Sequence, residues 1–146
     1  MKNIVILISG AGSNMAAIVK AAHKGAWSKQ LGVKVAAVIS NKPQASGLTW
    51  LQERSKFANI KTQTLDHTLF DSREAFDQSL MAKIDEHDPA LVVLAGFMRI
   101  LTPAFVAHYQ GRLINIHPSL LPSFRGARAI EQALAAGVRI SGCTAH

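Results

Sequence analysis

The hydrophobic residues of the chain form short, nearly continuous runs, and longer stretches with mixed apolar and polar positions separate them. Runs rich in valine, isoleucine and leucine are typical of strands that are buried on both faces of a parallel sheet. The runs cover residues 3–8, 33–39, 91–95 and 111–117. The stretches with helical patterns cover residues 13–24, 45–57, 72–87, 102–108 and 126–136. Strands that alternate with helices predict an α/β fold, a three-layer sandwich with a mostly parallel, Rossmann-like sheet.

Capping signals support two of the predicted helices. Ser72 precedes a helical stretch that has an acid, Glu74, in its first turn, and Pro89 follows the end of that stretch. Thr102 precedes another helical stretch, and Pro103 stands at its first position, where proline is well tolerated. Both helices are therefore expected to begin close to these residues.

Composition and length indicate one globular domain over residues 1–146. The chain is 49% hydrophobic and 17% charged, with a mean hydropathy of +0.17, and it contains no repeat or linker. The first eight residues resemble the head of a signal peptide, but no cleavage region follows, so a buried strand is the preferred interpretation. No apolar run approaches the roughly 18 residues of a membrane helix, and Cys143 is the only cysteine. We therefore expect a cytoplasmic protein without a membrane partner.

The chain is basic, and its positive charge is concentrated toward the carboxyl end. The formal net charge is +7, and from Arg99 onward five arginines accompany a single acid, Glu131. Such an excess favours anionic ligands such as phosphates and carboxylates. Nucleic acid is the rival interpretation, but the arginines are not interleaved with aromatic residues. We therefore expect small-molecule substrates and no nucleic-acid partner.

Each predicted strand is followed by residues with useful chemistry. In a parallel α/β sheet, ligands bind beyond the carboxyl ends of the strands. The four segments at those ends are Gly-Ala-Gly-Ser-Asn at 10–14, Ser-Asn-Lys-Pro at 40–43, Gly-Phe-Met-Arg-Ile-Leu at 96–101 and Asn-Ile-His at 115–117. The sequence therefore predicts one site at a single edge of the sheet.

The segment 10–14 joins a strand to a helix and is a candidate phosphate loop. Free backbone N–H groups and the helix dipole at such a junction bind phosphate. The segment is not a dinucleotide fingerprint, because Met15 occupies the place of the third glycine and the second strand does not end in an acid. It is not a Walker loop either, since no Gly-Lys-Ser/Thr follows. A phosphate outside a dinucleotide is the preferred ligand, and a plain glycine turn is the alternative.

The segment 96–101 carries more apolar residues than the sheet is expected to bury. It could line a slot for a flat heterocycle whose edges hydrogen-bond to backbone groups, and simple core packing is the alternative. Arg73, near a helix start, could pair with a ligand carboxylate, although an isolated arginine is usually solvated. These residues are candidates for binding a second ligand.

Asn115 and His117 form the most informative pair. Alternation along a strand places both side chains on one face, about 7 Å apart along the chain. An amide that donates hydrogen bonds and an imidazole that exchanges protons near neutral pH suit acyl transfer. Pro118 and Pro122 stiffen the loop that follows. The alternative is a histidine that merely caps the end of a strand.

Two other catalytic classes fit the sequence poorly. The six histidines are dispersed and form no His-Glu-x-x-His pair, so we expect no metal. Ser119 lies outside any Gly-x-Ser-x-Gly elbow, so a serine hydrolase is not expected.

Taken together, the motifs resemble those of the phosphoribosylglycinamide formyltransferases, the folate-dependent transformylases of purine synthesis. The matching segments are Ser-Gly-x-Gly-Ser-Asn at 9–14, Phe-Asp-Ser-Arg-Glu at 70–74, Leu-Ala-Gly-Phe-Met-Arg-Ile-Leu at 94–101, Asn-Ile-His-Pro-Ser-Leu-Leu-Pro at 115–122 and Gly-Cys-Thr-Ala-His at 142–146. The resemblance implies the formyltransferase fold. It also implies one-carbon transfer from 10-formyltetrahydrofolate to the amine of N1-(5-phospho-D-ribosyl)glycinamide, a step of de novo purine (IMP) biosynthesis.

The resemblance implies a role for each matching residue. The residues that would hold the ribonucleotide phosphate are Gly12, Ser13 and Asn14. Those that would contact 10-formyltetrahydrofolate, the co-substrate, are Arg73, Met98, Arg99, Ile100, Leu101 and Asn115. The catalytic residues would be His117 as the proton donor, Asn115 beside the formyl group, and His146. No metal and no covalent intermediate is implied.

Members of the family normally continue beyond the position of His146, and there they carry an aspartate that pairs with the catalytic histidine. We therefore expect a formyltransferase amino-terminal catalytic domain that is incomplete at its carboxyl end, a monomer or homodimer with little activity of its own. Two alternatives stay open: a hydrolase like formyltetrahydrofolate deformylase, which has a similar Asn-Ile-His stretch, and a non-catalytic fragment that binds a phosphorylated ligand. Methionyl-tRNA formyltransferase is a weaker alternative, because its comparable loop lacks the proline after the histidine.

Overall fold

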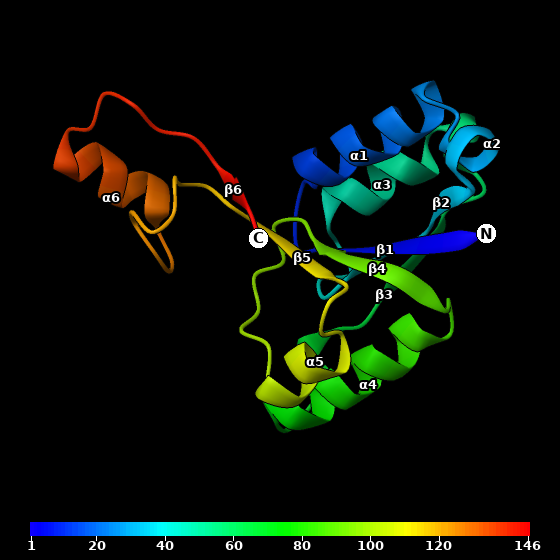
Figure 1. The fold of residues 1–146 in the computed structure, drawn as a ribbon. Coiled ribbons are helices and arrows are strands. Elements are labelled where there is room, and N and C mark those ends of the chain that lie inside the picture. The colour runs from blue at the N-terminus through cyan, green and yellow to red at the C-terminus, as the bar shows by residue number, and fades with distance from the viewer. The chain divides into compact units, whose positions relative to one another are not determined.

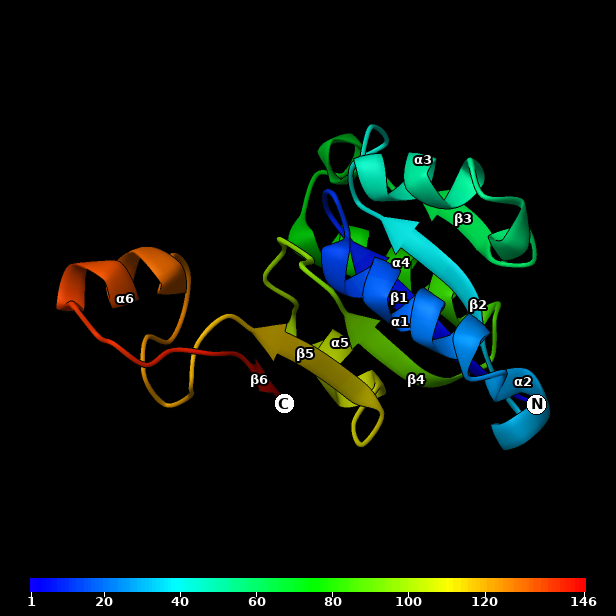
Figure 2. The same ribbon diagram turned by 90° about the horizontal axis from the view of Figure 1, so that it is seen from above.

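The computed structural model describes residues 1–146, which form two compact units, residues 1–113 and 114–146. Four parallel strands of the first unit lie in the order β3-β2-β1-β4 (Figure 1). They are β1 (Lys2–Ile8), β2 (Val33–Ser40), β3 (Lys61–Thr64) and β4 (Pro89–Leu94). Figure 2 shows β2, β1 and β4 side by side. The parallel α/β arrangement predicted from the sequence is therefore present in this unit.

Helices cover both faces of these strands. The helices of the first unit are α1 (Ser13–Lys24), α2 (Trp27–Leu31), α3 (Ser46–Gln52), α4 (Arg73–Asp85) and α5 (Pro103–His108), with short 3-10 turns η1 (Ser55–Phe57) and η2 (His67–Leu69). In Figure 1, α1 and α3 lie on one side of the strands and α4 and α5 on the other. The result is the predicted three-layer sandwich. No helix of the chain combines the length and the apolar character that crossing a membrane requires.

The side chains of β1 show why its hydrophobic run is continuous. Ile4, Ile6 and Ile8 pack in the core cluster that includes residues of α1 and α3. Val5 and Leu7 pack in a second cluster with residues of α4 and α5. Successive residues of a strand point to opposite faces, so a strand with helices on both sides needs apolar residues at every position.

Both predicted helix caps are present. The Ser72 hydroxyl accepts a hydrogen bond from the Ala75 N–H at 3.0 Å, at the start of α4. The Thr102 hydroxyl accepts one from the Phe105 N–H at 3.2 Å, at the start of α5, with Pro103 in the first turn. Each bond satisfies a donor that the first helical turn would leave unpaired.

The predicted helix over 45–57 is wrong in its second half. Helix α3 ends at Gln52, the backbone of Arg54 is extended, and a separate 3-10 turn follows. The Arg54 guanidinium donates a hydrogen bond to the carbonyl of Trp50 at 2.8 Å and lies 4.3 Å from the centroid of the Trp50 ring. The Arg54 N–H donates instead to the Leu51 carbonyl at 3.1 Å, a 3-10 bond with which the helical bonding of α3 ends.

The sequence analysis missed β3 and the short helix α2. Strand β3 has the sequence Lys-Thr-Gln-Thr and no buried residue, so it lacks the hydrophobic run on which the prediction depended. It pairs in parallel with β2 through backbone hydrogen bonds, from Ala37 opposite Lys61 to Ser40 opposite Thr64. Strand pairing through the backbone needs no apolar side chain, so the pattern could not predict it.

The second unit, residues 114–146, contains most of β5 (Leu113–His117), whose first residue belongs to the first unit. It also contains α6 (Ala129–Ala136) and β6 (Thr144–Ala145). β5 and β6 pair antiparallel, with Ile116 opposite Ala145 and His117 opposite Thr144. Helix α6 starts later than predicted because Gly126 and Arg128 have left-handed backbones, with φ of 79° and 59°, and a right-handed helix cannot include them. The single domain over residues 1–146 stays a prediction.

Candidate active site

The candidate phosphate loop lies at the amino-terminal end of α1. Gly12 is the residue before the helix, its backbone is left-handed (φ 67°, ψ 42°), and no side chain caps the first turn. A Cβ on Gly12 would lie 2.9 Å from the terminal carbon of Met15. The loop therefore requires glycine at this position, and the first N–H groups of α1 have no side-chain acceptor.

A cavity of about 300 Å³ lies beside this loop. The residues that line it are Ser9, Gly10, Ala11, Gly12, Ser13, Asn14, Lys42, Ala95, Gly96 and Met98. The chain has two salt bridges, and neither involves Lys42, whose side chain is exposed. Lys42 belongs to the segment 40–43 that was expected at the site, but the sequence analysis assigned it no individual role. The cavity thus combines backbone N–H groups with an uncompensated cation, which suits a phosphate group.

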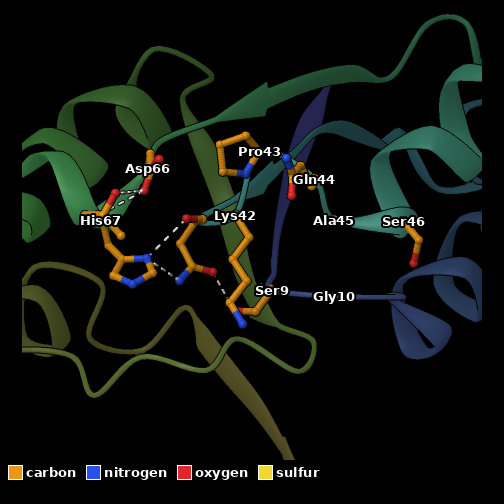
Figure 3. A pocket seen from close by; sticks show the side chains of 11 residues that line it. Ser9, Gly10, Lys42, Pro43, Gln44, Ala45, Ser46, Asp66 and His67 are labelled. Atoms are coloured by element: carbon orange, nitrogen blue, oxygen red, sulfur yellow. Dashed lines mark hydrogen bonds between the residues drawn. The ribbon is translucent and has the colours of Figure 1, made fainter.

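A network of three polar side chains joins the ends of β1 and β2. The Ser9 hydroxyl donates to Asn41 Oδ1 and accepts from the Met98 N–H at 2.7 Å. Asn41 Nδ2 lies 3.1 Å from Nδ1 of His67, which belongs to η2. Figure 3 shows the dashed lines of this network between His67 and Ser9, at a second cavity of about 480 Å³. The sequence analysis missed this network, because no local pattern joins residues so far apart.

Asp66 contributes a negative charge to the second cavity. Its carboxylate accepts hydrogen bonds from the hydroxyl and the N–H of Thr68, at 2.7 and 2.9 Å. These bonds lower the pKa of Asp66 below its usual range, so the side chain is ionised at neutral pH. The second cavity therefore presents both an anion and, at Lys42, a cation.

Residues of the segment 96–101 alternate between packed and exposed positions. Phe97 and Leu101 pack against the core cluster of α4 and α5, and the Arg99 guanidinium lies 5.1 Å from the centroid of the Phe76 ring. Met98 and Ile100 are 75% and 73% exposed. Core packing thus accounts for part of the segment, and two large apolar side chains remain accessible to a ligand.

The first unit brings together only some of the predicted binding residues. Gly12, Ser13, Asn14 and Met98 line one cavity. Four other predicted folate contacts in this unit line neither cavity; they are Arg73, Arg99, Ile100 and Leu101. Arg73 is the first residue of α4 and is exposed. The roles that the resemblance implies for these residues stay predictions.

The second unit brings Asn115, His117 and His146 together. Asn115 and His146 exchange two backbone hydrogen bonds, of 2.7 and 2.9 Å, and Asn115 Nδ2 lies 3.5 Å from His146 Nε2. The rings of His117 and His146 have centroids 6.4 Å apart. The β5–β6 pairing is therefore what places the two histidines and the amide at one position.

Hydrogen bonds orient both side chains of the Asn115 and His117 pair. Asn115 Oδ1 accepts from the Ile116 N–H at 2.9 Å, which leaves the Nδ2 donors turned away from the backbone. His117 Nε2 lies 2.8 Å from the carbonyl of Phe124. A carbonyl only accepts, so Nε2 carries a proton and Nδ1 is the nitrogen left to exchange one. The pair thus offers an amide donor and a free imidazole nitrogen, the groups that acyl transfer requires.

Buried hydrogen bonds stiffen the loop between β5 and α6. Ser119 is fully buried, and its hydroxyl donates to the Ser123 carbonyl at 2.6 Å. The Thr144 hydroxyl donates to the Ser119 carbonyl at 2.7 Å and accepts from the Leu121 N–H at 3.0 Å. Ser119 is thus a structural residue, in agreement with its exclusion as a nucleophile.

Sequence comparison identifies the class of protein to which this site belongs. Residues 2–146 match the model of the formyl transferase family, so the chain belongs to that family. Phosphoribosylglycinamide formyltransferase of Escherichia coli K12 is 51% identical over 144 residues, which are 99% of this chain and 64% of that protein. The human trifunctional purine biosynthetic protein adenosine-3 is 42% identical over 143 residues, 98% of this chain and 13% of that protein. The chain thus spans less than two thirds of these relatives.

Solved structures agree with this placement. Glycinamide ribonucleotide transformylase 1 of Symbiobacterium toebii superimposes with a TM-score of 0.89 at 38% identity, over 100% of this chain and 65% of that chain. Phosphoribosylglycinamide formyltransferase of Coxiella burnetii, in complex with CHES, gives a TM-score of 0.82 at 48% identity, over 99% and 64%. The predicted α/β fold and the resemblance to this family are confirmed.

Proposed function

We propose that the protein transfers the formyl group of 10-formyltetrahydrofolate to the amine of N1-(5-phospho-D-ribosyl)glycinamide. The observation that carries this proposal is the cluster of Asn115, His117 and His146, in a chain 51% identical to an enzyme of that name. Relatives with the same name at 38% identity and above support purine biosynthesis as its context and make a deformylase the less favoured alternative. The single cysteine, Cys143, is exposed and unpaired, which supports a reducing, cytoplasmic location.

The reaction needs charge stabilisation and proton transfer. The amine of the ribonucleotide attacks the formyl carbon, and the carbonyl oxygen becomes an oxyanion in a tetrahedral intermediate. The Nδ2 group of Asn115 donates a hydrogen bond to that oxyanion, because its own Oδ1 is already bound to the Ile116 N–H. His117, protonated, stabilises the same charge and delivers a proton to N10 of the folate as it leaves. The proton that the attacking amine loses returns to the His117 imidazole, which restores its protonated form.

The ribonucleotide phosphate would lie at the loop before α1. The uncapped N–H groups that follow Gly12 and the amine of Lys42 line one cavity of about 300 Å³, which is large enough for a phosphate group. The folate would lie against the exposed side chains of Met98 and Ile100, with Arg73 available for its carboxylates. Met98 also lines the phosphate cavity, so the two proposed ligand sites adjoin at this residue.

A transfer assay tests the proposal directly. The purified protein is mixed with both substrates, and formylated ribonucleotide and free formate are measured separately. We expect formyl transfer at the low rate anticipated from the sequence, and a further loss of about 10² to 10⁴ in rate for His117→Ala, because a proton-transfer group is removed. His23→Ala is the matched control, since His23 is an exposed histidine of α1. Formate release without transfer, or full activity of His117→Ala, would contradict the proposal.

A further inference from the structure

We propose that Ser9 is a positioning residue for the segment Met98–Leu101, an inference that rests on the folate site proposed above. Ser9 directly follows β1 and is only 4% exposed, although it lies in the wall of the cavity beside the phosphate loop. Its hydroxyl reaches the first residue of that segment, 89 residues further along the chain. Ser9 thereby links the strand before the phosphate loop to the segment that would hold the second substrate.

The chemistry of the two partners fixes the direction of both hydrogen bonds. The Met98 backbone N–H can only donate, so the Ser9 oxygen accepts from it, at 2.7 Å. The single proton of the Ser9 hydroxyl is then used for Asn41 Oδ1, which can only accept. The Ser9 hydroxyl therefore accepts one hydrogen bond, from Met98, and donates one, to Asn41. The donor and the acceptor cannot be exchanged in either bond.

Asn41 is itself held in one orientation. It is 2% exposed, directly after β2, and its Nδ2 group lies 3.1 Å from Nδ1 of His67. The same ring nitrogen lies 3.2 Å from the Asn41 carbonyl, but an Nδ1 that accepts from Nδ2 has no proton to donate to that carbonyl. Because the amide is buried and its nitrogen faces the imidazole, its oxygen faces Ser9. The hydroxyl of Ser9 therefore has a fixed direction before any ligand binds.

A second buried side chain holds the other end of the segment. Asp77 is 1% exposed, and its Oδ2 accepts from the Thr102 N–H at 2.8 Å. Between the two anchors, Met98 and Ile100 remain 75% and 73% exposed although both are large and apolar. A segment fastened at both ends can present such side chains to a ligand without collapsing onto the core. Ser9 supplies the anchor that is closer to the phosphate loop.

Removing the Ser9 hydroxyl tests this inference. Ser9→Ala leaves the Met98 N–H without its acceptor, whereas the backbone of the phosphate loop keeps its own contacts. Ser40→Ala is the matched control, because Ser40 is fully buried at the end of β2 and its hydroxyl bonds only to Lys42 backbone atoms. The measurements are the Kd of tetrahydrofolate, the Kd of N1-(5-phospho-D-ribosyl)glycinamide and the hydrogen exchange of the Met98 amide.

We expect Ser9→Ala to weaken tetrahydrofolate about tenfold and to accelerate exchange at Met98, while ribonucleotide affinity changes by less than about twofold. Ser9→Thr keeps a hydroxyl and restores tetrahydrofolate affinity. Ser40→Ala changes neither the tetrahydrofolate affinity nor the exchange at Met98. A general loss of packing would instead weaken both ligands and would affect the control as well.

The results that would overturn the inference also show whether the proposed function fails with it. Unchanged tetrahydrofolate affinity in Ser9→Ala, or an equal loss for both ligands, shows that Ser9 does not position the segment. If the unmodified protein binds no tetrahydrofolate, the proposed folate site is contradicted, and the inference is overturned with it. Failure of the inference alone is recognised when the unmodified protein binds both ligands and exchange at Met98 is the same in Ser9→Ala.

Discussion

Gly12 illustrates how a single backbone conformation prepares a ligand site. Its φ of +67° turns the chain sharply from β1 into α1, so the first N–H groups of the helix point outward with no side chain over them. Gly32 has nearly the same conformation, with φ of +63°, but it lies in open space between α2 and β2. Both positions therefore need glycine for their backbone conformation, but only Gly12 lies at the proposed ligand site. Substituting each one separates the effect on folding from the effect on ligand binding.

Gly12→Ala and Gly32→Ala are expected to share one effect and to differ in another. Both lose about 1–2 kcal/mol of folding stability, because alanine is strained in the left-handed region. Only Gly12→Ala weakens ribonucleotide binding, by about tenfold or more, since Gly12 lines the phosphate cavity and alanine disfavours the left-handed backbone that shapes this loop. Calorimetric titration and thermal unfolding measure the two effects. Equal ribonucleotide affinity in the two variants would contradict the proposal that this loop binds the phosphate.

Asn115→Asp tests the amide donor of the catalytic cluster. An aspartate oxygen can still accept from the Ile116 N–H, so the local structure is retained, but the variant has no N–H to offer an oxyanion. We expect formyl transfer to fall by about 10² to 10³ through kcat, with little change in the KM of either substrate. Steady-state kinetics provide the measurement, and a change confined to KM would contradict the proposed role.

At the level of elements, the ends of the helices depend on residues that the hydrophobic pattern does not show. Helix α2 begins after Ala26, which has a left-handed backbone (φ 47°, ψ 49°) although it carries a side chain. The α1–α2 connection needs this turn, and alanine adopts it at a cost in free energy. Helix α1, in contrast, contains Ala17 at an exposed interior position, where alanine is the best helix former.

Ala26→Gly should therefore stabilise the protein, by about 1 kcal/mol, because glycine adopts the left-handed region without a steric penalty. Ala17→Gly is the opposite control and should destabilise it by about 1 kcal/mol, because glycine lowers helix propensity. Denaturant unfolding of the two variants measures both differences. Destabilisation by Ala26→Gly would show that the connection is not strained at that residue.

At the level of the whole molecule, stability depends on pH through side chains that join distant elements. His87, just after α4, donates from Nε2 to Gln63 Oε1 of β3 at 2.8 Å, and its carbonyl accepts from Asn3 of β1 at 2.7 Å. Burial lowers the pKa of His87 below its usual value of 6.5, and the charge of Lys61 lowers it further. The folded protein therefore binds this proton less readily than the unfolded chain does.

The sign of the pH effect follows from that difference. When the unfolded state binds more protons, stability rises with pH, so the contribution of His87 is present above pH 6.5 and decreases as the pH falls below it. His87→Gln removes the titrating group and should flatten the unfolding free energy between pH 7 and pH 5, relative to the unmodified protein. Urea unfolding across this range tests the prediction, with the exposed His23→Gln as control. An identical slope in both variants would contradict it.

The sequence by itself determined the elements that depend on a regular pattern of apolar residues or on contacts between residues close together in the chain. Continuous apolar runs predicted β1 and β2, because strands covered on both faces cannot alternate. Ser72 and Thr102 predicted two helix starts, because a capping side chain acts within its own helical turn. The glycine loop and the Asn-Ile-His strand were recognised for the same reason, since spacing along the chain already places their groups on one side.

Tertiary structure alone decided what depends on partners far apart in the sequence. Strand β3 exists because its backbone pairs with β2. Asn115 and His146 meet because β5 pairs with β6, and Ser9 meets Met98 because β1 and β4 are neighbours in the sheet. Hydrogen bonds of this kind act over about 3 Å in space, so the periodicity of apolar and polar residues along the chain does not predict them. The chain thus encodes its strands and loops in local patterns, whereas only folding brings their polar groups within bonding distance.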